Sequence, residues 1–340
     1  MKKQLLIAAV AATMTSAAMA DISITGASKV NYTNTDYELA TKNDSNAFAH
    51  DTDFTIVGKN GGTTVSMTFA TTSASSAATA STDATVNDGT TTGSTATTTT
   101  DAKTGGLQTE DVFMTSSIGD VNVKVGTWDN GNDFVSASSR AANKFSANTT
   151  FSGVKVTYDA ANNSDESVTV SGSMSGVNAS YKQETAGEEI KLSTTVAGVS
   201  LAYHADNSDT ANTDRSSIEV SGEVSGIKLA YVQIDADTGV AIDSDSWAGD
   251  FEGATGAYAL TDDQDVTAMK VSTAMAGNTV AFTRTDVDGV ANEDTSINKF
   301  VVTRPLASGA TFEMTYTTLE DDGSTTTDAD TLDLELAVKF

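Results

Sequence analysis

A short unit that recurs along the second half of the sequence constrains the fold more than any other feature. In each copy a glycine follows an apolar residue by two positions and precedes an aromatic residue by five. The copies, the last two looser than the rest, span residues 151–158, 174–181, 196–203, 224–231, 251–258 and 275–282. Glycine adopts the positive φ of a tight turn, and beyond it apolar residues recur at every second position. The unit therefore predicts a tight turn that leads into a β-strand with one apolar face.

Polar stretches such as residues 206–214 and 235–245, rich in Asp, Asn, Thr and Ser, separate these units. Short turns at one end of the strands and longer loops at the other are typical of bacterial outer-membrane barrels. A β-solenoid or repeat adhesin would also contain short strands and glycines, but its stacked coils need a nearly fixed period. The glycines here lie between 22 and 32 residues apart. We therefore expect an antiparallel transmembrane β-barrel with an even number of strands, short periplasmic turns and longer outer loops.

The N-terminal half follows the same pattern less regularly. Candidate strands there cover residues 22–32, 53–59, 63–71, 107–118 and 121–128, and all candidates together give up to twenty strands. Residues 71–104 consist almost entirely of Thr, Ser, Ala, Asp and Gly, a composition that cannot bury a core. We interpret this segment as one long outer loop of a single barrel domain that covers residues 21–340.

The first twenty residues have the pattern of a secretory signal peptide. Two lysines precede the apolar run 5–12, and Ala18 and Ala20 form the small-residue pattern that signal peptidase cleaves. We expect residues 1–20 to be removed on export, so that the mature chain begins at Asp21 and resides in the outer membrane of a Gram-negative bacterium. No later stretch is apolar for the length that a spanning helix needs.

Beyond residue 20 the chain has 17 basic and 46 acidic residues, a formal charge of −29, and no cysteine. A nucleic-acid-binding protein needs a surplus of Lys and Arg on its contact surface, so nucleic acid is not an expected partner. A strongly acidic protein suits cationic solutes and divalent cations. Without cysteine, disulfides cannot contribute to the stability of this exported chain.

Strand alternation separates the apolar residues from the charged residues. A charged side chain facing lipid in the middle of the membrane would cost about 2–4 kcal/mol, so we expect the charged face to line the barrel interior. The lysines on this face are Lys29, Lys59, Lys124, Lys155, Lys182, Lys191, Lys228, Lys270 and Lys339. The acidic residues on it are Asp111, Glu189, Glu219, Glu223, Glu313, Asp333 and Glu335. A wide barrel lined in this way encloses an aqueous channel rather than a packed core.

The C-terminal segment carries a family resemblance. Residues 331–340 alternate strictly and end on Phe340, which resembles the assembly signal of outer-membrane proteins. Residues 304–316 resemble the penultimate turn and strand of Gram-negative general porins, and the acidic porins of alphaproteobacteria are the most similar. The resemblance implies a homotrimer of sixteen-stranded barrels, inserted into the lipid bilayer by the outer-membrane assembly machinery.

The resemblance also implies that the third outer loop folds inward and narrows the pore. That loop would be residues 128–143, with Asp129, Asn130 and Asp133 as its acidic rim. The family sets such carboxylates against basic residues on the opposite wall, for which Lys29 and Lys59 are the candidates.

Catalytic and metal-binding signals are weak, so we expect neither an enzyme nor a cofactor. His204, near abundant Ser and Asp, leaves an outer-membrane barrel hydrolase as an alternative. The acidic residues Asp286, Asp288, Glu293 and Asp294 resemble a fragment of a calcium loop without its full spacing. They indicate at most loosely bound Ca²⁺ or Mg²⁺ at the outer loops.

The two tryptophans, Trp128 and Trp247, are too few for a sugar-stacking ladder, and we expect them to anchor the barrel at the membrane interface. The combined interpretation is a passive diffusion channel for small hydrophilic solutes and ions that prefers cations. The alternative from a different class is a secreted or surface-layer adhesin, for which a Thr-rich acidic segment is typical.

Overall fold

The computed structural model describes residues 21–37, 44–72, 107–129, 140–161, 166–209, 214–237, 264–288, 295–321 and 328–340. The predicted signal peptide lies outside these ranges, as do residues 73–106 of the predicted low-complexity loop and 130–139 of the predicted constriction loop. Within the described ranges there is no helix of a length and hydrophobicity that would cross a membrane.

Eighteen β-strands make up the described part of the chain. The first nine are β1 (Asp21–Tyr37), β2 (Ser45–Asn60), β3 (Thr63–Thr72), β4 (Leu107–Ile118), β5 (Val121–Asp129), β6 (Arg140–Phe151), β7 (Val154–Ala160), β8 (Ser167–Met174) and β9 (Val177–Glu184). The second nine are β10 (Gly187–Val196), β11 (Val199–Ser208), β12 (Arg215–Val224), β13 (Ile227–Ala236), β14 (Gln264–Met275), β15 (Asn278–Asp288), β16 (Thr295–Pro305), β17 (Ala310–Asp321) and β18 (Ala329–Lys339).

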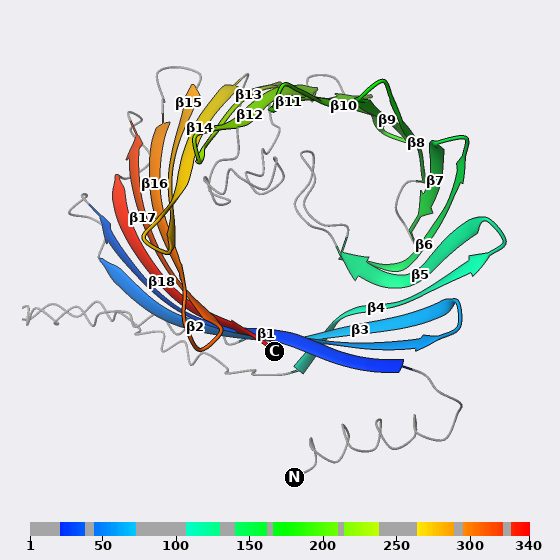
Figure 1. Cartoon of the computed structure of the whole chain (residues 1–340), viewed down its shortest axis with the longest axis horizontal. Coiled ribbons are helices and arrows are strands. Elements are labelled where there is room, and N and C mark those ends of the chain that lie inside the picture. The colour runs from blue at the N-terminus through cyan, green and yellow to red at the C-terminus, as the bar shows by residue number, and fades with distance from the viewer. Residues whose placement is uncertain are drawn as a thin grey trace, which may run out of the picture.

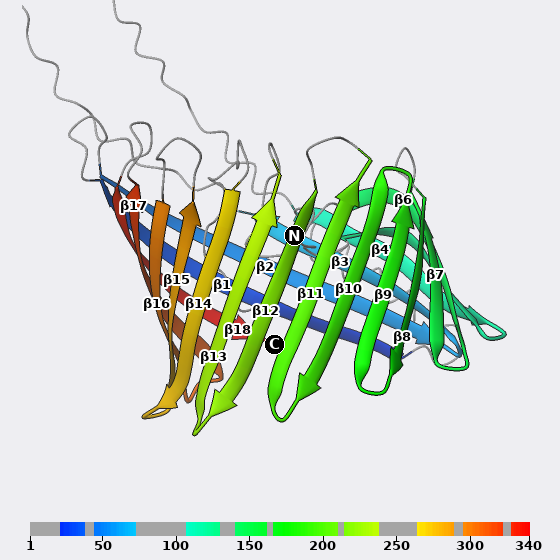
Figure 2. The ribbon, with the colours of Figure 1, turned by 90° about the horizontal axis from the view of Figure 1, so that it is seen from above.

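Hydrogen bonds link these strands into one closed antiparallel sheet (Figure 1). Each strand pairs with its sequence neighbours, and β1 also pairs with β18, which closes the ring. Closure requires the strands to be inclined to the barrel axis, as Figure 2 shows. The predicted antiparallel barrel is confirmed, but the sixteen strands implied by the resemblance are wrong. The strand count depends on the number of hairpins along the whole chain. The resemblance to general porins rests on residues near the C-terminus, and these residues do not determine that number.

The recurring unit forms tight turns at one end of the barrel. Ser152 and Gly153, between β6 and β7, have φ angles of 49° and 83°, the pair of positive values that a type I′ hairpin turn requires. Phe151 and Val154 pair directly on either side of this turn. The same Ser-Gly or Ala-Gly pair with positive φ recurs at residues 175–176, 197–198, 225–226 and 276–277. The predicted turns are confirmed at these five copies, and the copy around Gly253 lies outside the described residues.

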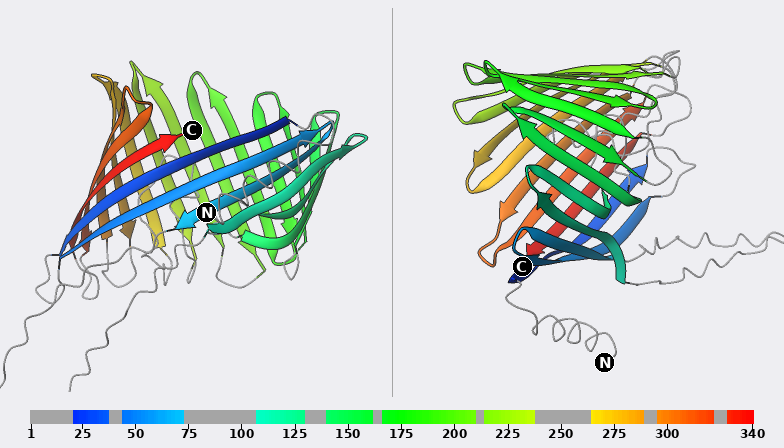
Figure 3. Two further views of the ribbon diagram at one scale, coloured as in Figure 1. Left: turned by 90° about the horizontal axis from the view of Figure 1, so that it is seen from below. Right: turned by 90° about the vertical axis from the view of Figure 1, so that its right-hand side faces the viewer.

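The first and last described strands meet at a seam that involves the last residue (Figure 3). The backbone N–H of Gly26 donates to the carbonyl of Phe340 over 2.8 Å, and the Phe340 N–H donates to the Gly26 carbonyl over 2.9 Å. A Cβ atom on Gly26 would lie 2.6 Å from Cζ of the Phe340 ring. The ring therefore covers a position that must lack a side chain, an arrangement in which an aromatic residue shields a strand glycine.

Candidate functional site: the lumen wall

The two faces of the barrel wall differ in chemistry. A hollow of about 520 Å³ is lined by residues of successive strands from β12 to β17, among them Lys228, Lys270 and Lys299. Side chains of several neighbouring strands can surround one hollow only on the concave side of a curved sheet, so this face is the lumen. Residues of opposite parity, such as Met269 and Val271, are large, apolar and exposed on the outer face.

Directly paired residues on neighbouring strands share a face of the sheet. The strand register therefore allows the lumen face to be identified on every strand of the ring, starting from the hollow. All lysines and acidic residues that the sequence assigned to the interior lie on the lumen face in the structure. The same face also carries charged residues that were not assigned: Lys144, Arg215, Lys299, Asp21, Asp51, Asp53, Asp159, Glu184 and Asp206. The described lumen wall therefore has similar numbers of basic and acidic groups, unlike the strongly acidic chain as a whole.

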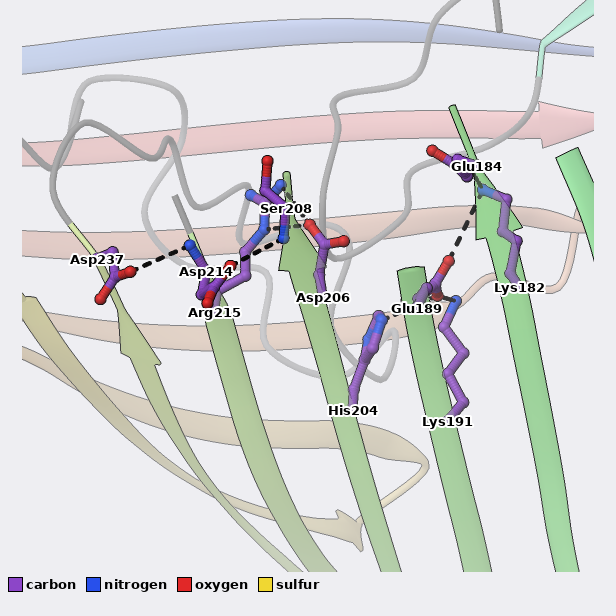
Figure 4. A network of polar contacts seen from close by, with 10 residues as sticks. All are labelled: Lys182, Glu184, Glu189, Lys191, His204, Asp206, Ser208, Asp214, Arg215 and Asp237. Atoms are coloured by element: carbon purple, nitrogen blue, oxygen red, sulfur yellow. Dashed lines mark hydrogen bonds and ion pairs between the residues drawn. The ribbon is translucent and has the colours of Figure 1, made fainter. Parts of the chain in front are cut away.

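A network of ion pairs covers the lumen face of β9, β10 and β11 (Figure 4). At its centre is Glu189, whose side chain is only 8% exposed. The Nε2 atom of His204 lies 2.9 Å from Oε1 of Glu189, and Lys191 contacts the same carboxylate oxygen. Lys182 contacts Glu184 and lies 3.7 Å from the second Glu189 oxygen. A buried carboxylate is stable when it is paired in this way, so this part of the wall neutralises its own charge.

The network continues towards the strand ends that lie opposite the tight turns. Nε and Nη2 of Arg215 on β12 both donate to Oδ2 of Asp206 on β11, over 3.2 and 3.1 Å. Asp214 accepts a hydrogen bond of 2.8 Å from the backbone N–H of Ser208, and Asp237 accepts one of 3.2 Å from the N–H of Asp214. Carboxylates thus hold the ends of three neighbouring strands together, as Figure 4 shows.

The lumen face of β13 to β15 differs from its neighbours because its outer half is apolar. Val232, Ile234 and Ala236 on β13 are 1–4% exposed and form one buried cluster with residues of β14 and β15. The register places Val232 opposite Ala268 and Ile234 opposite Val266. The lumen lining is therefore apolar rather than charged in the outer half of this sector. The two faces of β13 exchange polarity after Tyr231, because the lumen face continues with Val232, Ile234 and Ala236 while Gln233 and Asp235 follow on the outer face.

Closer to the tight turns, the same strands carry three lysines. Lys270 on β14 and Lys299 on β16 are both paired with Thr283 of β15, so they flank it in one cross-strand row. Lys228 on β13 is paired with Ser272, two positions from Lys270. These residues line the hollow described above, which also includes Glu223 and Glu313.

Acidic residues gather at the outer ends of the strands. Asp235, Asp265 and Asp288 occupy directly paired positions on β13, β14 and β15, and Asp36 is paired with Asp330. Like charges in direct cross-strand pairs are destabilising. We call Asp235, Asp265 and Asp288 the rim aspartates.

The residues of the predicted constriction are only partly described. Lys29 is paired with Asp51 on β2, and Lys59 is paired with Asp21. Asp129 ends β5, where its backbone pairs with Arg140, whereas Asn130 and Asp133 lie outside the described residues. The apposition of these carboxylates and lysines therefore stays a prediction.

Trp128 is part of the lumen wall, contrary to the expected anchoring role, and is 8% exposed. Its ring packs edge-on against Phe113, and the Nζ atom of Lys124 lies 3.9 Å from the Phe113 centroid and 4.3 Å from that of Trp128. The Lys144 ammonium donates to the Trp128 carbonyl over 2.9 Å. Trp128 has the same parity as Lys124, so strict alternation predicts this face. Trp247 lies outside the described residues.

The weak metal and catalytic candidates receive no support from their surroundings. Asp286 forms an ion pair of 2.8 Å with Arg284, and Asp288 belongs to the rim aspartates. Glu293 and Asp294 lie outside the described ranges, within which no group of three or more acidic, His or Cys side chains is arranged to hold a metal ion. The Ser217 hydroxyl donates to the His204 main-chain carbonyl over 3.3 Å, not to the ring. This arrangement does not resemble a nucleophile and its base.

Comparisons with known proteins agree with the barrel architecture. No protein-family model and no curated protein matches the sequence. Solved structures with a similar fold include OccAB4 of Acinetobacter baumannii, with a TM-score of 0.64 at 8% identity over 94% of this chain and 98% of that chain. OpdQ of Pseudomonas aeruginosa has a TM-score of 0.63 at 10% identity over 95% and 99%, and OccK11 (OpdR) of the same species has 0.64 at 11% over 94% and 96%.

These neighbours are 18-stranded outer-membrane porins of Gram-negative bacteria, of the Occ/OprD family. The narrower resemblance to general porins of alphaproteobacteria is not confirmed. At such identities the likeness extends to the fold, and the chain shares the fold of 18-stranded outer-membrane porin barrels.

Proposed function

We propose that this chain is a porin-type channel in the outer membrane of a Gram-negative bacterium, through which small hydrophilic solutes and ions diffuse passively. One observation carries the proposal: a closed barrel of eighteen strands with charged and hydroxyl side chains on its lumen face and large apolar side chains outside. Barrels of this strand number are wide enough to hold an aqueous channel. The apolar outer face suits a lipid environment.

The finer part of the proposal is a preference for cations. The described lumen wall is close to electrically balanced, so the preference would arise from the acidic surplus of the chain and from carboxylates at the outer ends of the strands. The rim aspartates are among these carboxylates, although they have the parity of the outer face. Carboxylates near a pore mouth raise the local concentration of cations and repel anions. The proposal also includes a homotrimer, an inward-folded loop at residues 128–143, export through residues 1–20, and loosely bound Ca²⁺ or Mg²⁺. The trimer and the loop are supported by the resemblance to general porins. Export and cation binding are supported by patterns of residues in the sequence.

Single-channel recording of the purified protein in a planar bilayer tests the proposal. We expect stable conductance steps and, across a KCl gradient, a reversal potential of the sign that cations produce. A reversal potential of the opposite sign would leave the channel in place but refute the role of the acidic rim. No conductance from a correctly folded sample would refute the channel and favour the adhesin.

Deletion of Phe340 discriminates between the same two classes in cells. A porin that needs the seam between Phe340 and Gly26 should fail to assemble in the outer membrane. A secreted adhesin lacking this residue should still be exported. Substitution of His204 should change no hydrolytic activity, because its ring is bound to Glu189.

A further inference from the structure

The apolar outer half of the lumen wall on β13 to β15 is more deeply buried than a single curved sheet explains. Val232, Ile234 and Val287 are 1%, 4% and 5% exposed, and all three have the parity of the lumen face. Valines of the same parity elsewhere on the wall, Val57 on β2 and Val301 on β16, are partly exposed. Burial as complete as that of Val232 therefore needs a further layer of chain.

Among the described residues, no element lies over this part of the wall. The eighteen strands form one sheet, a single layer thick, and the other described residues are tight turns and strand ends. Burial of aliphatic surface is favourable in proportion to its area, so a segment with apolar side chains suits this surface. We call this surface the lumen patch; it consists of Val232, Ile234, Ala236, Val266, Ala268 and Val287.

One segment outside the described ranges begins and ends at the lumen patch. Residues 238–263 connect β13 to β14, leaving two positions after Ala236 and returning three positions before Val266. Each half of this segment can span about 40 Å, whereas the patch extends about 13 Å along β13 and about 10 Å across the strands. The longer segment 73–106 has Val86 as its only large aliphatic residue. The large apolar residues of 238–263 are Val240, Ile242, Trp247, Phe251, Tyr258 and Leu260.

The wall has no position for a strand from this segment. The unit around Gly253 has the same spacing as the units that form a turn and a strand elsewhere. However, β13 is directly paired with β14 from Ile227 to Ala236, so no further strand is inserted between them. The apolar side chains of the segment therefore need another surface, and the lumen patch is within their reach.

We propose that residues 238–263 pack against the lumen patch, so that their apolar side chains and those of β13 to β15 form one small core inside the barrel wall. The inference goes beyond the proposed channel function and does not depend on conductance. It places Trp247 against the wall rather than at the membrane interface, the common position of tryptophan in such proteins. It also concerns a different segment from residues 128–143, to which the resemblance assigns an inward position.

Fluorescence of Trp247 distinguishes three positions of this residue. The chain has two tryptophans, so the variant Trp128→Phe leaves Trp247 as the only one. In the purified full-length barrel in phosphatidylcholine vesicles, acrylamide should quench Trp247 at least fivefold less than free N-acetyltryptophanamide, and brominated lipids should not quench it. Quenching by brominated lipids would place Trp247 at the membrane interface. Quenching by acrylamide as in the free compound would place it in solvent, and either result would overturn the proposal.

Matched substitutions in the wall locate the contact. In the same background, Val232→Asn/Ile234→Asn should raise the quenching of Trp247 by acrylamide at least threefold, because it makes the lumen patch polar. The control Val57→Asn/Val301→Asn makes a similar change at lumen residues outside the patch and should raise quenching less than twofold. Equal changes in both variants would overturn the contact.

A second pair of variants leaves the wall intact. Val240→Ser/Ile242→Ser removes apolar side chains from the segment alone and should also raise the quenching of Trp247 at least threefold. The control Val86→Ser makes the corresponding change in residues 73–106 and should leave quenching unaltered. Unchanged quenching in Val240→Ser/Ile242→Ser, in barrels that keep the compact, faster-migrating band on unheated gels, would overturn the packing of this segment.

Discussion

Two sectors of the lumen wall are built from the same kind of hairpin but differ in how their charged side chains are arranged. On β9 to β12 the charged residues face each other, and the carboxylate of Glu189 contacts Lys182, Lys191 and His204. On β13 to β16 the outer half of the wall is apolar, and three lysines border an open hollow nearer the tight turns. The first sector concentrates its charged side chains in one buried network, whereas the second combines an apolar half with three lysines, of which Lys228 is directly paired with Glu223.

The difference shows that two features of a strand have separate effects. Parity, the odd or even position of a residue along the strand, sets the face on which its side chain lies. Register, the alignment with the neighbouring strand, sets which side chains lie beside it. Parity puts a lysine on the lumen face, but register decides whether a carboxylate lies beside it. Lys182 is directly paired with Glu189, whereas Lys270 is paired with Ala230 and Thr283. We therefore expect the selectivity of the pore to depend more on β13 to β16, and its mechanical stability more on β9 to β12.

The largest expected effect comes from making the first sector resemble the second. Glu189→Ala leaves Lys182, Lys191 and the His204 ring without their shared carboxylate, and we expect the free energy of unfolding to fall by roughly 2 kcal/mol. To measure this loss, samples are heated to increasing temperatures before gel electrophoresis. The temperature at which the compact, faster-migrating band disappears reports the stability of the barrel. The control Glu188→Gln alters the adjacent residue on the outer face and should change stability far less. Equal losses in both variants would contradict the central role of Glu189.

A smaller effect is expected from neutralising the acidic rim above the second sector. Asp235→Asn, Asp265→Asn and Asp288→Asn together remove two directly paired like-charge contacts. Each removed contact should stabilise the barrel by about 0.5 kcal/mol. The reversal potential in a KCl gradient should move towards that of an unselective pore. An unchanged reversal potential would show that the rim does not govern selectivity.

The smallest effect distinguishes the two histidines. His204 lies in the ion-pair network on the lumen face, whereas His50 has the parity of the outer face. His204→Gln removes one contact from the buried Glu189 carboxylate, so we expect a small loss in the free energy of unfolding. His50→Gln should lower it less, because His50 lies outside this network. Equal losses, measured on the same gels, would contradict a role of the His204 ring in the network.

Features that depend on a few neighbouring residues, such as the turn conformations and the face on which a strand residue lies, could be predicted from the sequence. The pairs Ser152–Gly153 and Ala276–Gly277 have the positive φ angles that the recurring unit predicts, because these angles depend on two residues alone. Strict alternation also places Lys228 and Lys299 on one face of the wall, although only Lys228 was assigned there from the sequence.

Features that depend on register or on the number of hairpins could not be predicted. The contact between His204 and Glu189 requires the pairing of β10 with β11, which is set by the turn between them. The assumed role of Trp128 at the membrane interface followed a general preference of tryptophan and ignored its parity. The count of sixteen strands came from resemblance, whereas the ring holds eighteen.

The seam between Gly26 and Phe340 bears on the order of events during biogenesis. One edge of β1 can be completed only by β18, so the first strand waits for a partner more than 300 residues away. Contacts of such sequence separation form slowly. Until β18 has paired with β1, the sheet has two open edges that can pair with other chains. Closure of this barrel is therefore a single event, and an intermediate in which β18 has not yet paired is an open, aggregation-prone sheet rather than a smaller ring.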